Sequence, residues 1–204
     1  MNERSFIWVG NVISMTSKTK REDILEAAVT ILGRDGFNGL SIQKLAKEAK
    51  MAAGTVYLYF KDKDSVIAEV RLWLTRQVAE IIQKDVLSNQ SLYERYETMC
   101  HNVWSIGGSQ LGLLQTQIQY ESLPSPLSKE IRNLEKKLFD RLLSVFEEGR
   151  QSGKLKNLPD SVLYSLSLES CVALTRKHFQ EIDPIDSETY QLAIQASWDA
   201  ITTK

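Results

Sequence analysis

Residues 41–63 constrain the fold more than any other part of the chain, because they have the pattern of two short helices joined by a turn. Four residues at i, i+3, i+4 and i+7 give the first helix one apolar face: Ile42, Leu45, Ala46 and Ala49. The second helix, at about residues 53–60, is too short to be stable alone in water. The segment therefore needs further helices to bury its apolar sides.

In the second short helix, Val56 and Phe60 form the apolar side. The other side chains point elsewhere: Ala53, Thr55, Tyr57, Leu58 and Lys61. So much hydroxyl and aromatic surface on so small a helix indicates that it is presented outward to a binding partner.

The preceding helix has clear boundaries. Thr19 and Glu22 form a capping box that opens it, and an apolar stripe follows: Ile24, Leu25, Ala28, Ile31 and Leu32. Gly33 and Gly36 predict its end, because glycine readily adopts the left-handed conformation that stops helices.

Ser41 is the predicted N-cap of the first short helix. Asp62 or Asp64 can cap a much longer helix over residues 65–87. Its inner side is apolar: Val66, Val70, Trp73, Leu74, Val78, Ile81 and Ile82.

Residues 20–70, about a quarter of the chain, resemble the DNA-binding domain of the tetracycline-repressor (TetR) family of bacterial regulators. The resemblance rests on ILEAAVTILGRDGF followed by LSIQKLAKEAKMAAGTVYLYFKDKDSVI. Two residues depart from the family pattern. Lys50 replaces the usual turn glycine, which costs about 1 kcal/mol if the residue is left-handed, and Ala52 replaces a serine cap worth about 1 kcal/mol.

The resemblance implies an all-α protein of about nine helices. It implies a three-helix helix-turn-helix DNA-binding domain at residues 19–64, and a helical effector-binding and dimerisation domain at residues 65–204. Residues 1–18 form an N-terminal extension or arm, within which Met15 is the expected physiological start.

The recognition helix is expected to enter the major groove of operator DNA. Gly54 allows close approach, and an outward Leu58 can meet the methyl group of thymine. The resemblance assigns DNA contacts to hydroxyl-bearing residues, and other side chains suit phosphate contacts that set register. The full predicted set is Ser41, Gln43, Lys44, Ala53, Gly54, Thr55, Tyr57, Leu58, Tyr59 and Lys63. The alternative for each residue is an ordinary solvated surface position.

Charge permits DNA binding but does not demonstrate it. The formal net charge is −1, and residues 19–63 carry eight Lys or Arg against six Asp or Glu. Any basic surface must therefore be local, because a chain with this net charge cannot produce a broad positive electrostatic field.

Further helices are expected at residues 91–106, 109–121, 126–150, 160–179 and 187–201. Ser91 and Glu94 form a second capping box, and Gly107 with Gly108 predicts the end of that helix. The segment from residue 123 to residue 126, Leu-Pro-Ser-Pro, predicts a rigid link.

The last two helices are expected, from the resemblance, to pair with their copies in a homodimer. Small residues in the first of them would allow close approach: Ser167, Ser170, Cys171 and Ala173. The second offers one face: Tyr190, Ala193, Ile194, Ser197, Trp198 and Ile201. The alternative is that both helices only close the core of the monomer. A two-fold dimer would read a palindrome with half-sites about 34 Å apart.

The resemblance also implies a small hydrophobic or aromatic effector that releases a repressor from its operator. Candidate pocket residues are Tyr93, Tyr96, Glu97, Cys100, Trp104, Tyr120, Phe139 and Tyr164. If Glu97 points inward beside Trp104, a cationic ligand gains charge pairing and cation–π attraction. Aromatic residues at helical spacing are otherwise ordinary core.

The sequence gives little support for an enzyme, a metal-binding protein or a membrane protein. His101 and His178 lack metal-ligand spacing, and no nucleophile and base are grouped as in an enzyme, so no catalytic residue, metal or cofactor is expected. Cys100 and Cys171 suit a reducing cytoplasm, and no apolar run is long enough for a bilayer. The remaining alternative is a DNA-binding regulator without a small ligand, controlled by a protein partner or constitutive.

Overall fold

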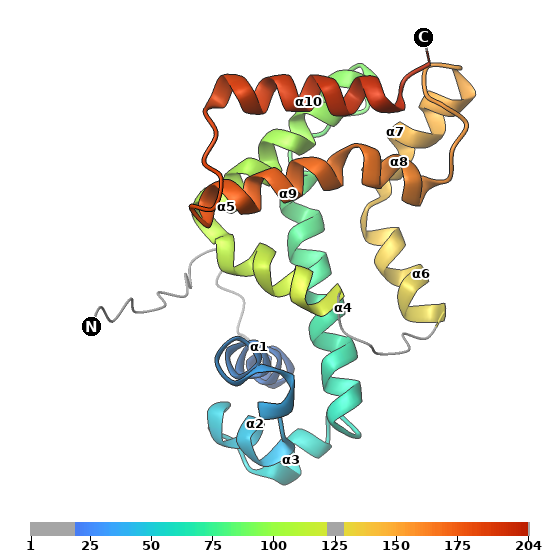
Figure 1. Ribbon diagram of the computed structural model, residues 1–204. Coiled ribbons are helices and arrows are strands. Elements are labelled where there is room, and N and C mark those ends of the chain that lie inside the picture. The colour runs from blue at the N-terminus through green and yellow to red at the C-terminus, as the bar shows by residue number, and fades with distance from the viewer. Residues whose placement is uncertain (1–18, 122–128, 204) are drawn as a thin grey trace. The chain divides into compact units, whose positions relative to one another are not determined.

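The computed structural model describes residues 19–121 and 129–203. The predicted N-terminal extension, including Met15, and the predicted Leu-Pro-Ser-Pro link lie outside the described residues. The all-helical fold is confirmed: the described residues form ten helices and no strand, apart from a single bridge between Leu155 and Thr202 (Figure 1).

The helices are α1 (Lys20–Gly39), α2 (Ile42–Glu48), α3 (Ala53–Tyr57), α4 (Lys63–Ile82), α5 (Leu92–Glu121), α6 (Lys129–Leu138), α7 (Asp140–Gln151), α8 (Asp160–Leu166), α9 (Leu168–Phe179) and α10 (Ser187–Ile201). They belong to two compact units. Of the described residues, the first unit contains 19–74 with 116–121, and the second contains 75–115 with 129–203.

In the first unit, α1 begins with the predicted capping box. The backbone N–H of Thr19 donates to Glu22 Oε2 at 2.9 Å, and the N–H of Glu22 donates to Thr19 Oγ1 at 3.3 Å. The regular helix breaks at Gly36, whose φ of 67° lies in the left-handed region, whereas Gly33 stays within the helix. The break turns the chain toward α2, which packs against α1 and α3.

Asp62, one of the two residues predicted to cap the long helix, caps the start of α4. Asp62 Oδ1 accepts from the Ser65 N–H at 2.8 Å, and Ser65 Oγ accepts from the Asp62 N–H at 3.1 Å. The helix ends at Ile82 rather than at residue 87. A regular helix could not reach residue 87, because Asp85 has a left-handed φ of 58°.

The prediction that a helix ends at Gly107 and Gly108 is wrong, since α5 continues to Glu121. The glycines serve packing instead. A Cβ atom on Gly107 would lie 2.4 Å from side-chain atoms of both Phe179 and Thr175. Only glycine lets α9 approach α5 so closely at this point.

The predicted helix over residues 126–150 is two helices, α6 and α7, separated at Phe139 with φ −101° and ψ 41°. The buried side chain of Gln83 lies against the break. Its Nε2 donates to the Leu138 carbonyl at 2.8 Å, and its Oε1 accepts from the Arg141 N–H at 2.9 Å. The Leu138 carbonyl and the Arg141 N–H, on either side of the break, are therefore both paired with Gln83, the residue directly after α4.

The predicted helix over residues 160–179 is also divided, at Ser167, whose φ of −121° and ψ of −98° are not helical. This residue is fully buried, and its hydroxyl donates to the Leu163 carbonyl. A serine can stand at this break because its hydroxyl finds a backbone acceptor inside the core.

The second unit has its core between α5, α7, α9 and α10. The stripe of α10 predicted to form a dimer interface lies largely in this core: Tyr190, Ile194, Ser197, Trp198 and Ile201 are all buried within one chain. Cys171 and Ser167, two of the small residues predicted for helix–helix approach, are buried as well. These side chains pack the monomer, because α10 needs one apolar face to cover α5.

Candidate functional site

The turn between α2 and α3 has the two departures expected from the sequence. Lys50 adopts a φ of 54°, in the region that favours glycine. Ala52 is the N-cap of α3 and offers no side-chain hydrogen bond. The turn is closed by backbone instead, since the Met51 N–H donates to the Ala46 carbonyl at 2.8 Å.

Two buried side chains, Val56 and Phe60, fix the orientation of α3. The Arg21 guanidinium lies over the Phe60 ring, 5.6 Å from its centroid, and Arg21 also pairs with Glu69 at 2.7 Å. Arg21 of α1 therefore contacts both Phe60, three residues beyond the end of α3, and Glu69 of α4. Nothing in the sequence pattern had singled out Arg21.

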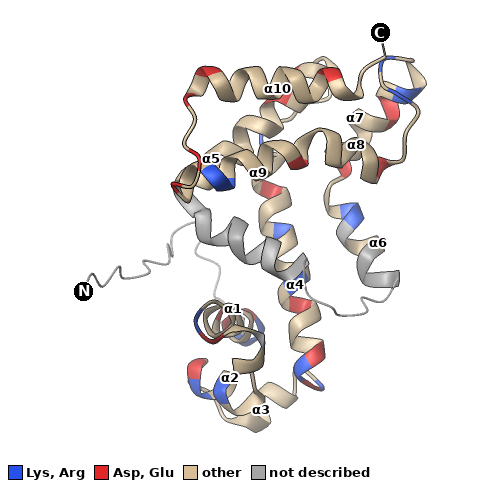
Figure 2. Cartoon of the chain, in the orientation of Figure 1, with Lys and Arg blue, Asp and Glu red and all other residues tan. Residues whose placement is uncertain are grey.

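Helix α3 ends at Tyr57, three residues before the predicted end at residue 60, and three large side chains at and just after this end are exposed to solvent. Tyr57 is 54% exposed, Leu58 is 82% exposed and Tyr59 is 42% exposed. Neither acid nor base occurs within α3 itself, whereas lysines lie on α2 and at the start of α4 (Figure 2). The surface is thus apolar and hydroxyl-rich at its centre, with charge at its margins.

The other predicted DNA contacts surround this surface. Gln43, Lys44 and Gly54 are exposed, whereas Ser41, Ala53, Thr55 and Lys63 are half-buried. Ser41 is the N-cap of α2, and its Oγ accepts a hydrogen bond from the Lys44 N–H at 3.2 Å.

A small ion-pair network adjoins α2 and was not anticipated. Lys44 Nζ lies 3.5 Å from Asp35 Oδ2, and Arg34 bridges Asp35 and Glu48. Hydrogen bonding to Arg34 holds the pKa of Asp35 below its usual value. The Asp35 carboxylate thus holds the Lys44 ammonium group near α1, and a DNA phosphate would have to compete with this carboxylate for Lys44.

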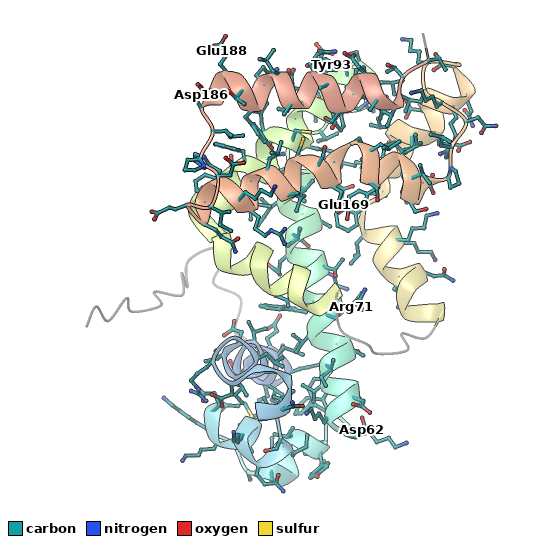
Figure 3. The ribbon with its side chains drawn as sticks, in the orientation of Figure 1. Asp62, Arg71, Tyr93, Glu169, Asp186 and Glu188 are labelled. Atoms are coloured by element: carbon teal, nitrogen blue, oxygen red, sulfur yellow. The ribbon has the colours of Figure 1, made fainter. Side chains whose placement is uncertain are left out.

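In the second unit, part of the predicted pocket set lies along one face of α5. Tyr93 Oη donates to Glu97 Oε1 at 3.0 Å, and Gln191 Nε2 from α10 donates to the same oxygen at 2.6 Å. Burial and the Glu97 carboxylate raise the pKa of Tyr93 to about 12. Tyr93 lies beside α10 (Figure 3), with its ring centroid 5.7 Å from that of Trp198.

About two turns beyond Glu97 along α5, Trp104 joins an aromatic cluster that the sequence did not predict. Its ring centroid lies 4.2 Å from Tyr190, 4.5 Å from His178 and 5.2 Å from Phe179. His178 Nδ1 accepts from the Ile185 N–H at 3.1 Å, which fixes the connection between α9 and α10. This histidine therefore has a structural contact.

Two further predicted pocket residues, Tyr96 and Cys100, are fully buried. Tyr96 Oη lies 2.6 Å from Ser197 Oγ and 3.9 Å from Cys171 Sγ. Burial raises the pKa of the Cys100 thiol well above its usual value. These polar groups find their partners inside the protein, between α5, α9 and α10.

The remaining pocket candidates come from elsewhere. Phe139 lies at the break between α6 and α7, and Tyr164 lies in α8; both are half-buried. The side chain of Tyr120 lies outside the described residues. Within residues 19–121 and 129–203 there is no group of acidic, histidine or cysteine residues able to hold a metal ion. No helix in the same ranges is both long and apolar enough to cross a membrane.

Comparison with known proteins agrees with this architecture. Residues 24–70 match the bacterial regulatory proteins of the tetR family, and residues 91–202 match the tetracyclin repressor-like C-terminal domain. An uncharacterised helix-turn-helix transcriptional regulator of Haemophilus influenzae is 33% identical over 183 residues, covering 88% of this chain and 94% of the relative.

Two other relatives are informative. A TetR-family regulator structure from Vibrio parahaemolyticus matches with a TM-score of 0.83 and 41% identity, covering 91% of this chain and all of that chain. The fatty acid metabolism regulator of Bacillus subtilis is 27% identical over 141 residues, covering 68% of this chain and 72% of the relative. The helix-turn-helix geometry and these matches together show that the chain belongs to the TetR family of DNA-binding transcriptional regulators.

Proposed function

We propose that the protein is a repressor that binds a palindromic operator as a homodimer and is released by a small hydrophobic or aromatic effector. The observation that supports DNA contact through α3 most directly is the exposure of Tyr57, Leu58 and Tyr59 at the end of this helix, next to the buried Val56 and Phe60. Such a regulator acts on chromosomal DNA, so we place it in the bacterial cytoplasm and assign it no catalytic role.

The proposed DNA contacts divide into two groups. Gly54, Thr55, Tyr57, Leu58 and Tyr59 would face base edges, with Ala53 beside them. Ser41, Gln43, Lys44 and Lys63 would contact phosphates and set the register. Because the charge excess of this region is small, affinity depends on two recognition helices acting together.

The dimer surface we propose is the outer side of α8 and α10, because their inner sides are buried within one chain. Val162 is 39% exposed, Leu166 is 43% exposed and Leu192 is 66% exposed. Burying such side chains against a second copy is favourable. Leu192→Glu should convert a dimer into a monomer in sedimentation, and a monomeric wild type at micromolar concentration would contradict the assignment.

The effector region we propose is the α5 face around Tyr93, Glu97 and Trp104. These residues are only half-buried, unlike Tyr96 and Cys100, so a ligand can reach them with smaller rearrangement. A ligand and DNA that prefer different conformations lower each other's affinity by the same factor. The relative from Bacillus subtilis regulates fatty acid metabolism, so fatty acids belong in the first ligand panel beside aromatic cations.

One pair of measurements tests this function. Selection of bound fragments from genomic DNA should return a palindrome, and a thermal-shift screen should find a compound that both stabilises the protein and releases the palindrome. A palindrome without any such compound would favour a regulator controlled by a protein partner or acting constitutively.

A further inference from the structure

The exposed side chain of Leu58 has no role in holding the fold. It follows α3 as its C-cap, where the backbone N–H donates to the Thr55 carbonyl at 3.2 Å. Its neighbours at two residues on either side, Val56 and Phe60, are buried, and Leu58 itself is 82% exposed. Among the large apolar side chains in the described part of the chain, none is more exposed.

The residues around Leu58 limit what this surface can read. Arginine or lysine reads guanine, asparagine or glutamine reads adenine, and aspartate or glutamate reads cytosine. None of these residue types occurs between Ala52 and Phe60. The available base-reading groups are the hydroxyls of Thr55, Tyr57 and Tyr59 and the apolar side chain of Leu58.

The major groove offers one apolar group that distinguishes the bases, the C5 methyl of thymine. Contact between that methyl and Leu58 removes apolar surface of both partners from water. Cytosine, which has a hydrogen at C5 in place of the methyl, gives less apolar contact.

We propose that Leu58 is a specificity-determining residue that reads a thymine through its C5 methyl group, once in each operator half-site. This inference rests on the proposed function, because it requires operator binding through α3. The flanking tyrosines can contact base edges through their hydroxyls, whereas Leu58 selects the thymine.

The test uses the full chain and an operator selected from a random DNA pool. Each thymine is replaced in turn by deoxyuridine, which keeps the hydrogen-bonding groups and lacks only the methyl. At one position in each half-site, the wild type should bind the uridine operator about 3-fold to 10-fold more weakly, whereas other positions should change little. At the sensitive position, Leu58→Ala should bind the thymine and uridine operators equally.

Leu87→Ala serves as the matched control, since Leu87 is 54% exposed and lies beyond the end of α4. It should keep the full uridine effect, and all variants should keep the wild-type melting temperature. If uridine is tolerated at every position, or if the penalty is unchanged in Leu58→Ala, the inference is overturned while operator binding stands. If the wild type selects no DNA at all, the proposed function fails, and the inference fails with it.

Discussion

The side-chain amide of Gln83 donates a hydrogen bond of 2.8 Å to the carbonyl oxygen of Leu138, from the end of α4 to the end of α6. The same side chain accepts from the Arg141 N–H at the start of α7, and the Arg141 guanidinium donates back to the Gln83 carbonyl at 2.6 Å. One residue thus completes the hydrogen bonding of three helix ends in the second unit.

Gln83→Leu should destabilise the protein by about 1–3 kcal/mol, because it removes the buried amide that pairs with the part-buried Leu138 carbonyl and Arg141 N–H. Chemical denaturation monitored by circular dichroism measures the change. Gln180→Leu is the control, since Gln180 is exposed at the end of α9, and its effect should stay within about 0.5 kcal/mol. Equal effects of the two substitutions would show that the contacts of Gln83 contribute little.

Gly107→Ala should destabilise the second unit by roughly 1–3 kcal/mol, because the new methyl group would clash with Phe179 and Thr175. Gly33→Ala should instead stabilise by about 0.5–1 kcal/mol, since Gly33 is helical and a Cβ there meets nothing within 4 Å. Thermal melts of both variants give the comparison. If Gly107→Ala left the melting temperature unchanged, α5 and α9 would have to be able to move apart without loss of stability.

Ala52→Ser should stabilise the protein by about 1 kcal/mol by giving α3 the side-chain cap that it lacks. Operator affinity should not be abolished, because the exposed face of α3 is unchanged. Denaturation and DNA titration on the same sample separate the two effects. Loss of operator binding in a stabilised Ala52→Ser variant would show that the present turn geometry is itself needed for recognition.

Asp160 at the start of α8 accepts from Arg150 Nη1 at 2.9 Å and pairs with Lys136 Nζ at 2.6 Å. These partners, Lys136 foremost, hold the pKa of Asp160 below its ordinary value of 3.8. A depressed pKa means that the carboxylate stabilises the fold above the unfolded pKa, and that this contribution is lost as the pH falls through the folded pKa.

Asp160→Asn should therefore lower stability at pH 7 by about 1 kcal/mol, a modest figure because the pair is partly solvated. It should also lose less stability than the wild type between pH 5 and pH 3. Asp183→Asn, at an exposed position between α9 and α10, should follow the wild-type pH curve. An unchanged acid profile in Asp160→Asn would contradict the proposed contribution of this pair.

Local features of the fold could be predicted from the sequence, because their partners are close in the chain. The capping boxes at Thr19 and Ser91 join residues three apart, and Lys50 takes the left-handed conformation that its position in the turn requires. The breaks at Phe139 and Ser167 could not be predicted, because they depend on side chains packed from other helices. Gln83 lies 55 residues from Leu138.

The candidate sites show the same division. The exposed face of α3 follows from the burial of Val56 and Phe60 four residues apart. For α10, the apolar stripe predicts burial but not what buries it. The expectation from the sequence is that Tyr190 and Trp198 contact a second copy, whereas they pack on α5 of their own chain. Likewise, Tyr96 has the pattern of a pocket residue, yet its hydroxyl is paired with Ser197.

The measurement that tests the central claim most directly is the operator affinity of the Tyr57→Ala variant, measured by fluorescence anisotropy with a selected DNA fragment. Tyr57 is 54% exposed, so the variant should keep its fold by circular dichroism and its oligomeric state by sedimentation. Operator affinity should fall at least 10-fold. Wild-type affinity in Tyr57→Ala would contradict the claim that this face of α3 reads DNA.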